Sequence, residues 1–315
     1  MKTQRLGTSD LEVSRLAYGC MRIARTWRRA DLTPEKIDTG IAILEAAVDA
    51  GYTLFDHADI YGDTTCETIY GHALDRHPDW RDRLVVTTKC GIRFPNQPNP
   101  GDPGRYDFSP AHIRESVEAS LARLKLDTLD LLQLHRPDYL ADYRAVARTL
   151  IELREAGQVR YFGVSNFRPQ LVENLQRLLP DDHLIVNQIE ISLQRPDCLW
   201  DGCLDECQAN QRTPLAWGPL AAGQLGTGYV PNGRDPDYAK TALRLRVLDE
   251  VAAEVGAERG EVALAWLLRH PAGIIPIVGS ANPERIRQAV RADEIELSHT
   301  QWYRLMEGAL GHRVP

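Results

Sequence analysis

The sequence predicts an α/β protein, a closed (β/α)8 TIM barrel preceded by a β-hairpin. Short runs rich in β-branched residues alternate with longer amphipathic segments, which is typical of parallel strands covered by helices. Eight such runs occur, and several are continuously apolar, as expected of strands buried on both sides. Barrels of this kind commonly reach the length of this chain, 315 residues, so we expect one domain over residues 1–315.

The barrel strands are expected where the apolar runs lie. In chain order they are Leu16–Gly19, Thr53–Asp56, Leu84–Lys89, Leu129–Leu134, Tyr161–Val164, Ile185–Gln188, Pro214–Trp217 and Ile274–Val278. Upstream, Gln4–Leu6 and Glu12–Ser14 flank the turn-rich segment Gly7–Asp10, which predicts a hairpin that closes the barrel floor.

Capping residues mark where helices begin. Thr33-Pro34 and Ser109-Pro110 each indicate an N-cap followed by proline in the first turn. Thr64 and Glu67 have the spacing of a capping box at the start of another helix. Between the helices that begin at Thr64 and at Ser109, the segment Gly91–Tyr106 is rich in proline, glycine and asparagine, which predicts an unstructured functional loop. Further helices are expected at Ala141–Ala156, Pro169–Leu179, Asp201–Gln211, Lys240–Val255, Glu261–His270 and Pro283–Val290.

The composition is that of an ordinary soluble globular protein, with 43% hydrophobic and 26% charged residues. A net charge of −7 argues against nucleic acid or an anionic membrane surface as the main partner. No apolar run approaches the roughly 20 residues that span a bilayer, and Met1–Asp10 lacks the apolar core of a secretory signal. We therefore expect a cytoplasmic protein, a monomer or weak homo-oligomer.

The six cysteines are irregularly spaced, as in proteins that keep reduced thiols. Cys198, Cys203 and Cys207 form a cluster, but no histidine lies nearby and no CxxC pair occurs. We interpret them as buried thiols and expect no metal site.

Polar residues follow one strand after another. Asp56 and Tyr61, then Lys89, then His135 stand at or just beyond the ends of successive strands. Each alone has an ordinary structural explanation, such as a turn cap or a satisfied interior histidine. Strand ends in a parallel barrel meet on one face, however, and polar groups at so many buried ends are costly unless they converge on a site. We therefore predict an active site at this face.

Longer motifs surround these residues. They are Phe55–Gly62 (FDHADIYG), Val85–Lys89 (VVTTK), Leu131–His135 (LLQLH), Gly163–Phe167 (GVSNF) and Val186–Glu190 (VNQIE). Together, and in this order as far as Arg285, they resemble the motifs of the aldo-keto reductase family. The resemblance covers nearly the whole chain.

The resemblance implies an NADP-dependent oxidoreductase that reduces small carbonyl compounds, with Tyr61 as general acid and base. A free tyrosine has a pKa of about 10, and a neighbouring ammonium favours the phenolate, so we expect Lys89 to lower the pKa of Tyr61. Asp56 is expected to hold Lys89 charged and oriented. His135 is expected to hydrogen-bond the substrate oxygen.

The resemblance also implies a cofactor, NADP(H), with NAD(H) possible. Ser165, Asn166 and Gln188 resemble residues that hold the nicotinamide carboxamide, and the last strand and its helix resemble the segment for the adenosine 2′-phosphate. The expected cofactor-binding residues are Met21, Arg22, Ser165, Asn166, Gln188, Trp217, Gly218, Leu220, Gly223, Gly279, Ser280 and Arg285. Residues expected to line the substrate pocket are Met21, Trp27, Phe94 and Trp217.

The chain departs from the family pattern at two positions. Gly279 stands where many members carry a lysine, which weakens the expectation of NADP over NAD. Ile191 stands where many members place a tyrosine against the nicotinamide, so that ring must rest on Ile191 or on Trp217. Neither departure affects the proton-transfer group.

Three alternatives remain at this point. Lys89 could form a Schiff base in an aldolase, although that chemistry gives no reason for the spacing of Asp56 and Tyr61. The segment His135–Asp138 is similar both to potassium-channel beta subunits, for which a non-enzymatic regulatory role is the second alternative, and to related bacterial reductases, and a bacterial stand-alone oxidoreductase is the nearer match. Cys20 could act as a nucleophile, but no neighbouring pattern supplies a base for it.

Overall fold

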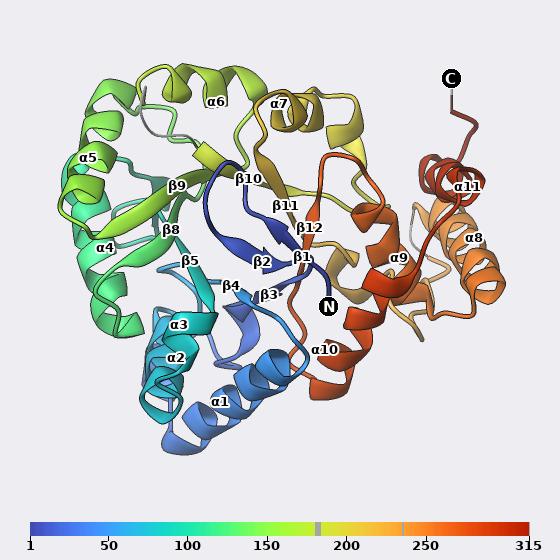
Figure 1. Ribbon diagram of the computed structural model, residues 1–315, viewed down its shortest axis with the longest axis horizontal. Coiled ribbons are helices and arrows are strands. Elements are labelled where there is room, and N and C mark those ends of the chain that lie inside the picture. The colour runs from blue at the N-terminus through green and yellow to red at the C-terminus, as the bar shows by residue number, and fades with distance from the viewer. Residues whose placement is uncertain (180–183, 235, 315) are drawn as a thin grey trace.

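The computed structural model describes residues 1–179, 184–234 and 236–314, and eight parallel strands close into a barrel (Figure 1). Around the barrel they follow one another as β3 (Ala17–Gly19), β4 (Leu54–Asp56), β5 (Val85–Cys90), β8 (Leu129–Leu134), β9 (Val159–Ser165), β10 (Leu184–Glu190), β11 (Thr213–Trp217) and β12 (Ile275–Val278). The predicted (β/α)8 fold is confirmed, with strand ends shifted by up to two residues.

The predicted N-terminal hairpin is present. β1 (Thr3–Arg5) pairs antiparallel with β2 (Glu12–Ser14), and Figure 1 shows the pair lying across one end of the barrel. Leu6, Leu11 and Val13 pack against residues inside the barrel such as Leu54 and Leu131. The hairpin therefore seals the floor and leaves the opposite end, where the strands finish, for a site.

Ion pairs also tie the floor together. Asp130, at the start of β8, accepts hydrogen bonds from Arg81 at 3.1 Å, from Arg160 at 3.2 Å and from the amide of Val86 at 2.9 Å. Arg160 bonds in turn to Asp10 in the hairpin turn at 3.0 Å. Asp10, Arg81, Asp130 and Arg160 line an open cavity of about 420 Å³ on the floor side of the molecule. Its buried carboxylate is already paired, so we interpret this network as structural.

Helices surround the barrel (Figure 1). They are α1 (Pro34–Asp49), α2 (Thr65–Arg76), α3 (Trp80–Arg83), α4 (Pro110–Leu124), α5 (Tyr143–Glu155), α6 (Pro169–Gln176), α7 (Cys203–Ala209), α8 (Tyr238–Val255), α9 (Arg259–Leu268), α10 (Pro283–Ala289) and α11 (His299–Leu310), with 3-10 turns η1 (Cys20–Arg22), η2 (Arg29–Asp31), η3 (Asp197–Leu199), η4 (Ala221–Gly223) and η5 (Val290–Glu294). Thr33 and Ser109 cap α1 and α4 as predicted, each accepting a backbone N–H.

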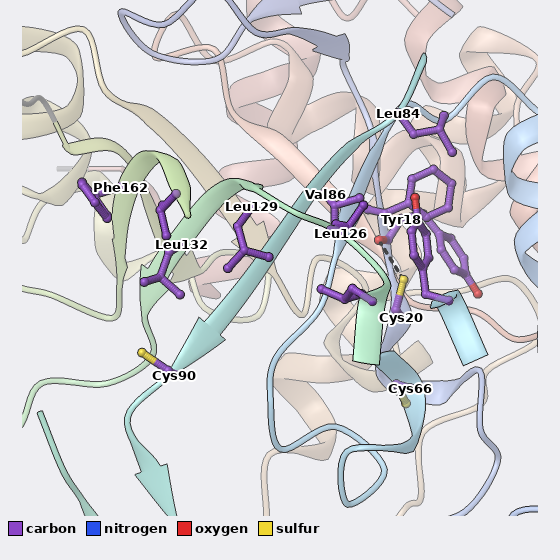
Figure 2. Packing of buried hydrophobic residues seen from close by; sticks show 14 of the residues in the cluster. Tyr18, Cys20, Cys66, Leu84, Val86, Cys90, Leu126, Leu129, Leu132 and Phe162 are labelled. Carbon is purple, nitrogen blue, oxygen red and sulfur yellow. Dashed lines mark hydrogen bonds between the residues drawn. The ribbon is translucent and has the colours of Figure 1, made fainter. Parts of the chain in front are cut away.

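An apolar layer fills the space between strands and helices. Figure 2 shows part of it: Val86 on β5 lies beside Leu126 and Tyr18, and Leu132 on β8 lies beside Leu129 and Phe162. Inside the barrel, space is tighter. A Cβ on Gly163 would lie 2.3 Å from Cγ2 of Val186, so only glycine fits at this point of β9. At this point the barrel interior is a packed core.

Two local predictions are wrong. Thr64 adopts a left-handed conformation, with φ of 72°, and its side chain does not cap α2. Its expected partner Glu67 instead accepts hydrogen bonds from Thr88 on β5 and Arg123 on α4. The loop expected at Gly91–Tyr106 contains a small hairpin, β6 (Ile92–Arg93) with β7 (Arg105–Tyr106).

Of the helices in the described residues, none is long and apolar enough to cross a membrane.

Candidate active site

Asp56, Tyr61 and Lys89 meet at the mouth of the barrel. Lys89 lies near the end of β5, and its Nζ is 2.7 Å from a carboxylate oxygen of Asp56, which ends the neighbouring strand β4. The same Nζ donates to the hydroxyl of Tyr61 at 3.3 Å. β4 and β5 pair directly, with Asp56 opposite Thr87, so the sheet register fixes this geometry.

The lysine is buried yet charged. Its side chain is fully buried and that of Asp56 is 4% exposed. Burial by itself lowers the pKa of Lys89, but the charge of Asp56 and the contact with Tyr61 raise it, and the net pKa lies above the ordinary value. Lys89 therefore stays an ammonium near neutral pH and holds a fixed positive charge beside the phenol.

The net pKa of Tyr61 differs from the expectation. Burial raises it, the Lys89 ammonium lowers it, and burial outweighs the ammonium, so the pKa lies above its ordinary value. The expected net lowering is therefore wrong for the protein alone, although the predicted effect of Lys89 is present as the opposing influence. Tyr61 is a protonated phenol near neutral pH, the form that can give up a proton.

His135 lies across from Tyr61, with the two ring centroids 6.1 Å apart. It follows β8 and is 9% exposed. Burial and the charges of Lys89 and Arg136 hold its pKa well below the ordinary value, so the imidazole is neutral. Its Nδ1 has no hydrogen-bond partner among the described residues. A neutral ring with one nitrogen protonated can donate to an oxygen at the mouth.

A hydrogen-bond chain joins this cluster to the ends of the later strands. Gln188 Nε2 donates to Asp56 at 2.8 Å, and the Ser165 hydroxyl donates to the carbonyl of Gln188 at 2.9 Å. Asn166 donates to Ser165 at 2.8 Å and accepts from the indole N–H of Trp217 at 2.9 Å. Ser165, Asn166, Gln188 and Trp217, the four predicted residues at the ends of β9, β10 and β11, therefore share one hydrogen-bond network with Asp56. Asp56, Tyr61, Lys89 and His135 are called the Tyr61 cluster below.

The structure distinguishes between the two residues proposed to lie against a nicotinamide. Ile191 is fully buried in the core on the outer side of β10 and β11, where it packs with Leu193 and Ala216. Trp217 is partly exposed at the end of β11 and belongs to the hydrogen-bond network. Ile191 therefore offers no surface to a ligand, and Trp217 remains.

Glycines leave the backbone open beyond Trp217. Gly218 and Gly223 have φ of 65° and 96°, and a Cβ on Gly223 would meet nothing within 4 Å. Leu220 between them is partly buried against the core. This open backbone, the planar indole of Trp217 and the amides of Asn166 and Gln188 fit a dinucleotide with a carboxamide-bearing ring.

The residues predicted for the 2′-phosphate lie beyond β12, which pairs with β3 and β11. Gly279 and Arg285 are exposed, and Arg285 forms no ion pair among the described residues. Ser280 accepts a hydrogen bond from Tyr18 through its carbonyl, and its hydroxyl accepts the amide of Asn282 at 3.2 Å. Within the described part of the chain, no hydrogen bond or ion pair links these residues directly to Asp56, Tyr61, Lys89 or His135.

The expected pocket residues are less uniform. Met21 and Arg22 lie in η1, directly after β3, with the Met21 side chain 37% exposed. Trp27 is 57% exposed in the same connection, and Phe94 is partly exposed beyond β6. Met21, Arg22, Trp27 and Phe94 all belong to connections that follow strands. Among the described residues, no hydrogen bond or ion pair joins Trp27 or Phe94 to the Tyr61 cluster.

The cysteines are free buried thiols. In Figure 2, Cys20 lies beside Tyr18, and its sulfur is 4.0 Å from the Tyr18 carbonyl oxygen. Burial raises the pKa of Cys20 well above its ordinary value, which disfavours a nucleophilic thiolate. Within the described part of the chain, no group of histidine, cysteine and carboxylate side chains could hold a metal ion.

One functional contact had no sequence signal. The carbonyl of His57 accepts a hydrogen bond from Lys89 Nζ at 2.6 Å, which makes it a third partner of the ammonium. A backbone carbonyl carries no residue-type signature. The His57 ring itself is fully buried edge-on to Tyr70, and neither ring nitrogen has a partner among the described residues.

The fold and site place a phenol, an ammonium, a carboxylate and an imidazole at the mouth of a parallel barrel. Comparisons with known proteins show the family to which the chain belongs. The model of the aldo/keto reductase family matches residues 15–308. The oxidoreductase YcsN of Bacillus subtilis is 40% identical, with 97% of both chains covered. The 6-dehydroglucose reductase of Agrobacterium fabrum is 39% identical, with 99% of both covered. Glycerol dehydrogenase AKR11B4 of Gluconobacter oxydans superimposes with a TM-score of 0.85 at 26% identity, with 98% of this chain and 95% of that chain covered.

These comparisons identify the class as oxidoreductases of the aldo/keto reductase type. The chain belongs to the aldo/keto reductase family.

Proposed function

We propose that this protein reduces small aldehydes and ketones to alcohols with NADP(H), and that Tyr61 supplies the proton. The contact of the Tyr61 hydroxyl with the buried Lys89 ammonium, itself paired with Asp56, supports this most directly. Carbonyl reduction requires a proton donor at the oxygen, and a phenol held beside a fixed cation is suited to that task.

Each residue of the cluster has a distinct part. Tyr61 donates its proton to the substrate oxygen, and the Lys89 ammonium stabilises the phenolate that remains. Asp56 keeps Lys89 charged and in place, with Gln188 holding the other side of the carboxylate. Neutral His135 donates a second hydrogen bond to the same oxygen. A bound nicotinamide would supply the hydride.

The cofactor is assigned to the later strand ends. Ser165, Asn166 and Gln188 would hold the carboxamide and Trp217 would lie against the ring, as proposed from the motifs. Ser280 and the exposed guanidinium of Arg285, unpaired among the described residues, favour NADP(H), because a planar fork of donors suits a phosphate. Gly279 supplies no positive charge for the 2′-phosphate, so the preference for NADP(H) over NAD(H) is not fixed by this position. Titration of the protein with NADPH and with NADH would measure it.

Tyr61→Phe tests the proposal. We expect a loss of about 10²–10⁴-fold in kcat for aldehydes with NADPH, because the proton donor is gone, and an unchanged Kd for NADPH. The matched control, Tyr303→Phe, alters an exposed tyrosine of α11 and should keep full activity. The substrate panel includes 6-dehydroglucose, since two relatives carry that substrate in their names. Wild-type turnover by Tyr61→Phe in a step limited by chemistry would refute the mechanism.

Borohydride trapping distinguishes the aldolase alternative. A Schiff base at Lys89 would leave a stable adduct after treatment with borohydride and substrate. We expect no adduct, because Lys89 is held as an ammonium by Asp56.

A further inference from the structure

Arg136 is a cation at the mouth with no protein acceptor in the described part of the chain. It follows His135 directly and is partly buried, yet its guanidinium has neither an ion pair nor a hydrogen bond among the described residues. Arginines elsewhere on the barrel, such as Arg81 and Arg160, pair with carboxylates. A guanidinium carries five N–H donors that cannot be neutralised by deprotonation, so a partly buried one without acceptors is costly unless a ligand supplies them.

The guanidinium of Arg136 lies against the ring of Trp217. Its central carbon lies 5.7 Å from the ring centroid of Trp217, within reach of a cation–π contact. Trp217 is itself anchored by the hydrogen bond from its indole N–H to Asn166. A cation–π contact uses none of the five N–H donors of the guanidinium, so these donors remain free for an oxyanion.

The strand order places Arg136 on the substrate side of the mouth. β4, β5 and β8 are neighbours in the barrel. Asp56 lies on β4, Lys89 lies on β5, and His135 directly follows β8. The residues assigned to the cofactor follow β9 to β12 and β3 instead. Arg136 directly follows His135, which is assigned to the reacting oxygen, and its guanidinium lies against Trp217, which is assigned to the nicotinamide ring, so it lies between the residues assigned to the substrate oxygen and to the ring that delivers the hydride.

A second connection at the mouth is also positive. The connection after β3 carries Arg22, Arg25, Arg28 and Arg29, all exposed and none in an ion pair among the described residues. Two carboxylates, Asp31 and Asp63, bond to this connection and offset only part of that charge. Unpaired arginines in these two connections, on a chain of net charge −7, attract anions toward this part of the mouth.

We propose that Arg136 binds a carboxylate or phosphate group of the substrate, so that the enzyme prefers carbonyl compounds carrying a negative charge. This inference rests on the proposed carbonyl reductase function. A carboxylate and a phosphate both present an oxyanion. We expect the Arg136 guanidinium to bind that oxyanion, a few bonds from the carbonyl carbon, while Tyr61 and His135 contact the carbonyl oxygen.

The test compares 4-oxobutanoate with butanal, aldehydes of the same length with and without a carboxylate, at saturating NADPH. We expect kcat/KM of the wild type to favour 4-oxobutanoate, and this preference to weaken with added salt. Arg136→Gln should lower kcat/KM for 4-oxobutanoate by about 10- to 100-fold, mainly through KM, and that for butanal by less than about 3-fold. Arg136→Lys should restore part of the loss. Arg148→Gln, an exposed arginine of α5 without an ion pair among the described residues, is the charge-matched control.

Three outcomes would overturn the inference. Equal losses for both aldehydes would mean that Arg136 only positions Trp217. A weaker Kd for NADPH with an unchanged ratio between the aldehydes would assign the anion to the cofactor. A wild type that shows no preference for 4-oxobutanoate, nor for glyceraldehyde 3-phosphate over glyceraldehyde, would exclude charged substrates. No turnover of any carbonyl would instead refute the proposed function itself.

Discussion

Lys89→Met should separate the structural part of the buried ion pair from its chemical part. The substitution keeps an apolar stem of similar length but removes the ammonium, so the Asp56 carboxylate loses its partner at 2.7 Å while it stays 4% exposed. Gln188 remains as one donor at 2.8 Å. Removing one member of a buried pair leaves an uncompensated charge, and we expect a loss of about 3–5 kcal/mol in the free energy of unfolding.

The double variant Asp56→Asn/Lys89→Met removes both charges. The carboxamide oxygen introduced by Asp56→Asn can still accept the Gln188 hydrogen bond, so we expect most of the lost stability to return, because the charge that was costly is gone. Activity should not return: both variants are expected to lose about 10²–10⁴-fold in kcat, since nothing stabilises the phenolate of Tyr61.

Urea unfolding followed by circular dichroism measures the stability, and oxidation of NADPH with an aldehyde measures the activity. Lys240→Met, an exposed lysine of α8, is the control and should match the wild type in both. If Lys89→Met unfolds at the wild-type urea concentration, the pair carries no net stability. If the double variant recovers turnover, Lys89 has no part in the chemistry.

Three further predictions follow from single positions. Gly163→Ala should lose about 1–3 kcal/mol of stability, because its Cβ would lie 2.3 Å from Val186 Cγ2; an unchanged urea midpoint would show that the barrel interior yields there. Burial and the Lys89 charge lower the pKa of His57 to about 3, so the unfolded chain binds a proton that the folded chain does not between about pH 6.5 and pH 3. Wild-type stability should therefore fall as pH drops through that window, and His57→Leu should show a smaller fall; parallel slopes would contradict this. Gly279→Lys has open space for its side chain and should raise the preference for NADPH over NADH by about 10-fold, measured as a ratio of Kd values. An unchanged ratio would place the 2′-phosphate elsewhere.

The barrel and its hairpin were predictable because their signals are periodic and local. The strand that carries Lys89 and the strand that His135 follows are six-residue strands built mainly around valine and leucine, so their apolar residues reveal them in the sequence. Convergence of Asp56, Lys89 and His135 followed from a general property of parallel barrels, in which strand ends share one face.

The errors have physical causes that involve distant parts of the chain. Glu67 matches a capping box in sequence, but Thr88 and Arg123 compete for its carboxylate, and the positive φ of Thr64 points the cap away. Strands of two residues, as in the β6–β7 hairpin, give no periodic signal in a segment rich in proline and glycine.

Burial governs the remaining differences. The pKa of Tyr61 depends on how much solvent the fold removes as well as on the neighbour that attracts its proton. The choice between Ile191 and Trp217 required knowing which side of the sheet each residue occupies. The free donors of Arg136 are visible only once the carboxylates of the described residues have been placed.

The ion network around Asp130 has a consequence for how this protein can diversify. It fastens the hairpin turn to β8 and β9 at the floor, and β8, at six residues, sets that fastening roughly 20 Å from the mouth. Loops that recognise substrate can therefore be exchanged or lengthened without loosening the closure that keeps the chain folded. In a laboratory selection for new substrates, variants should accumulate in the β3–α1 and β8–α5 connections, while Asp130, Arg81 and Arg160 persist.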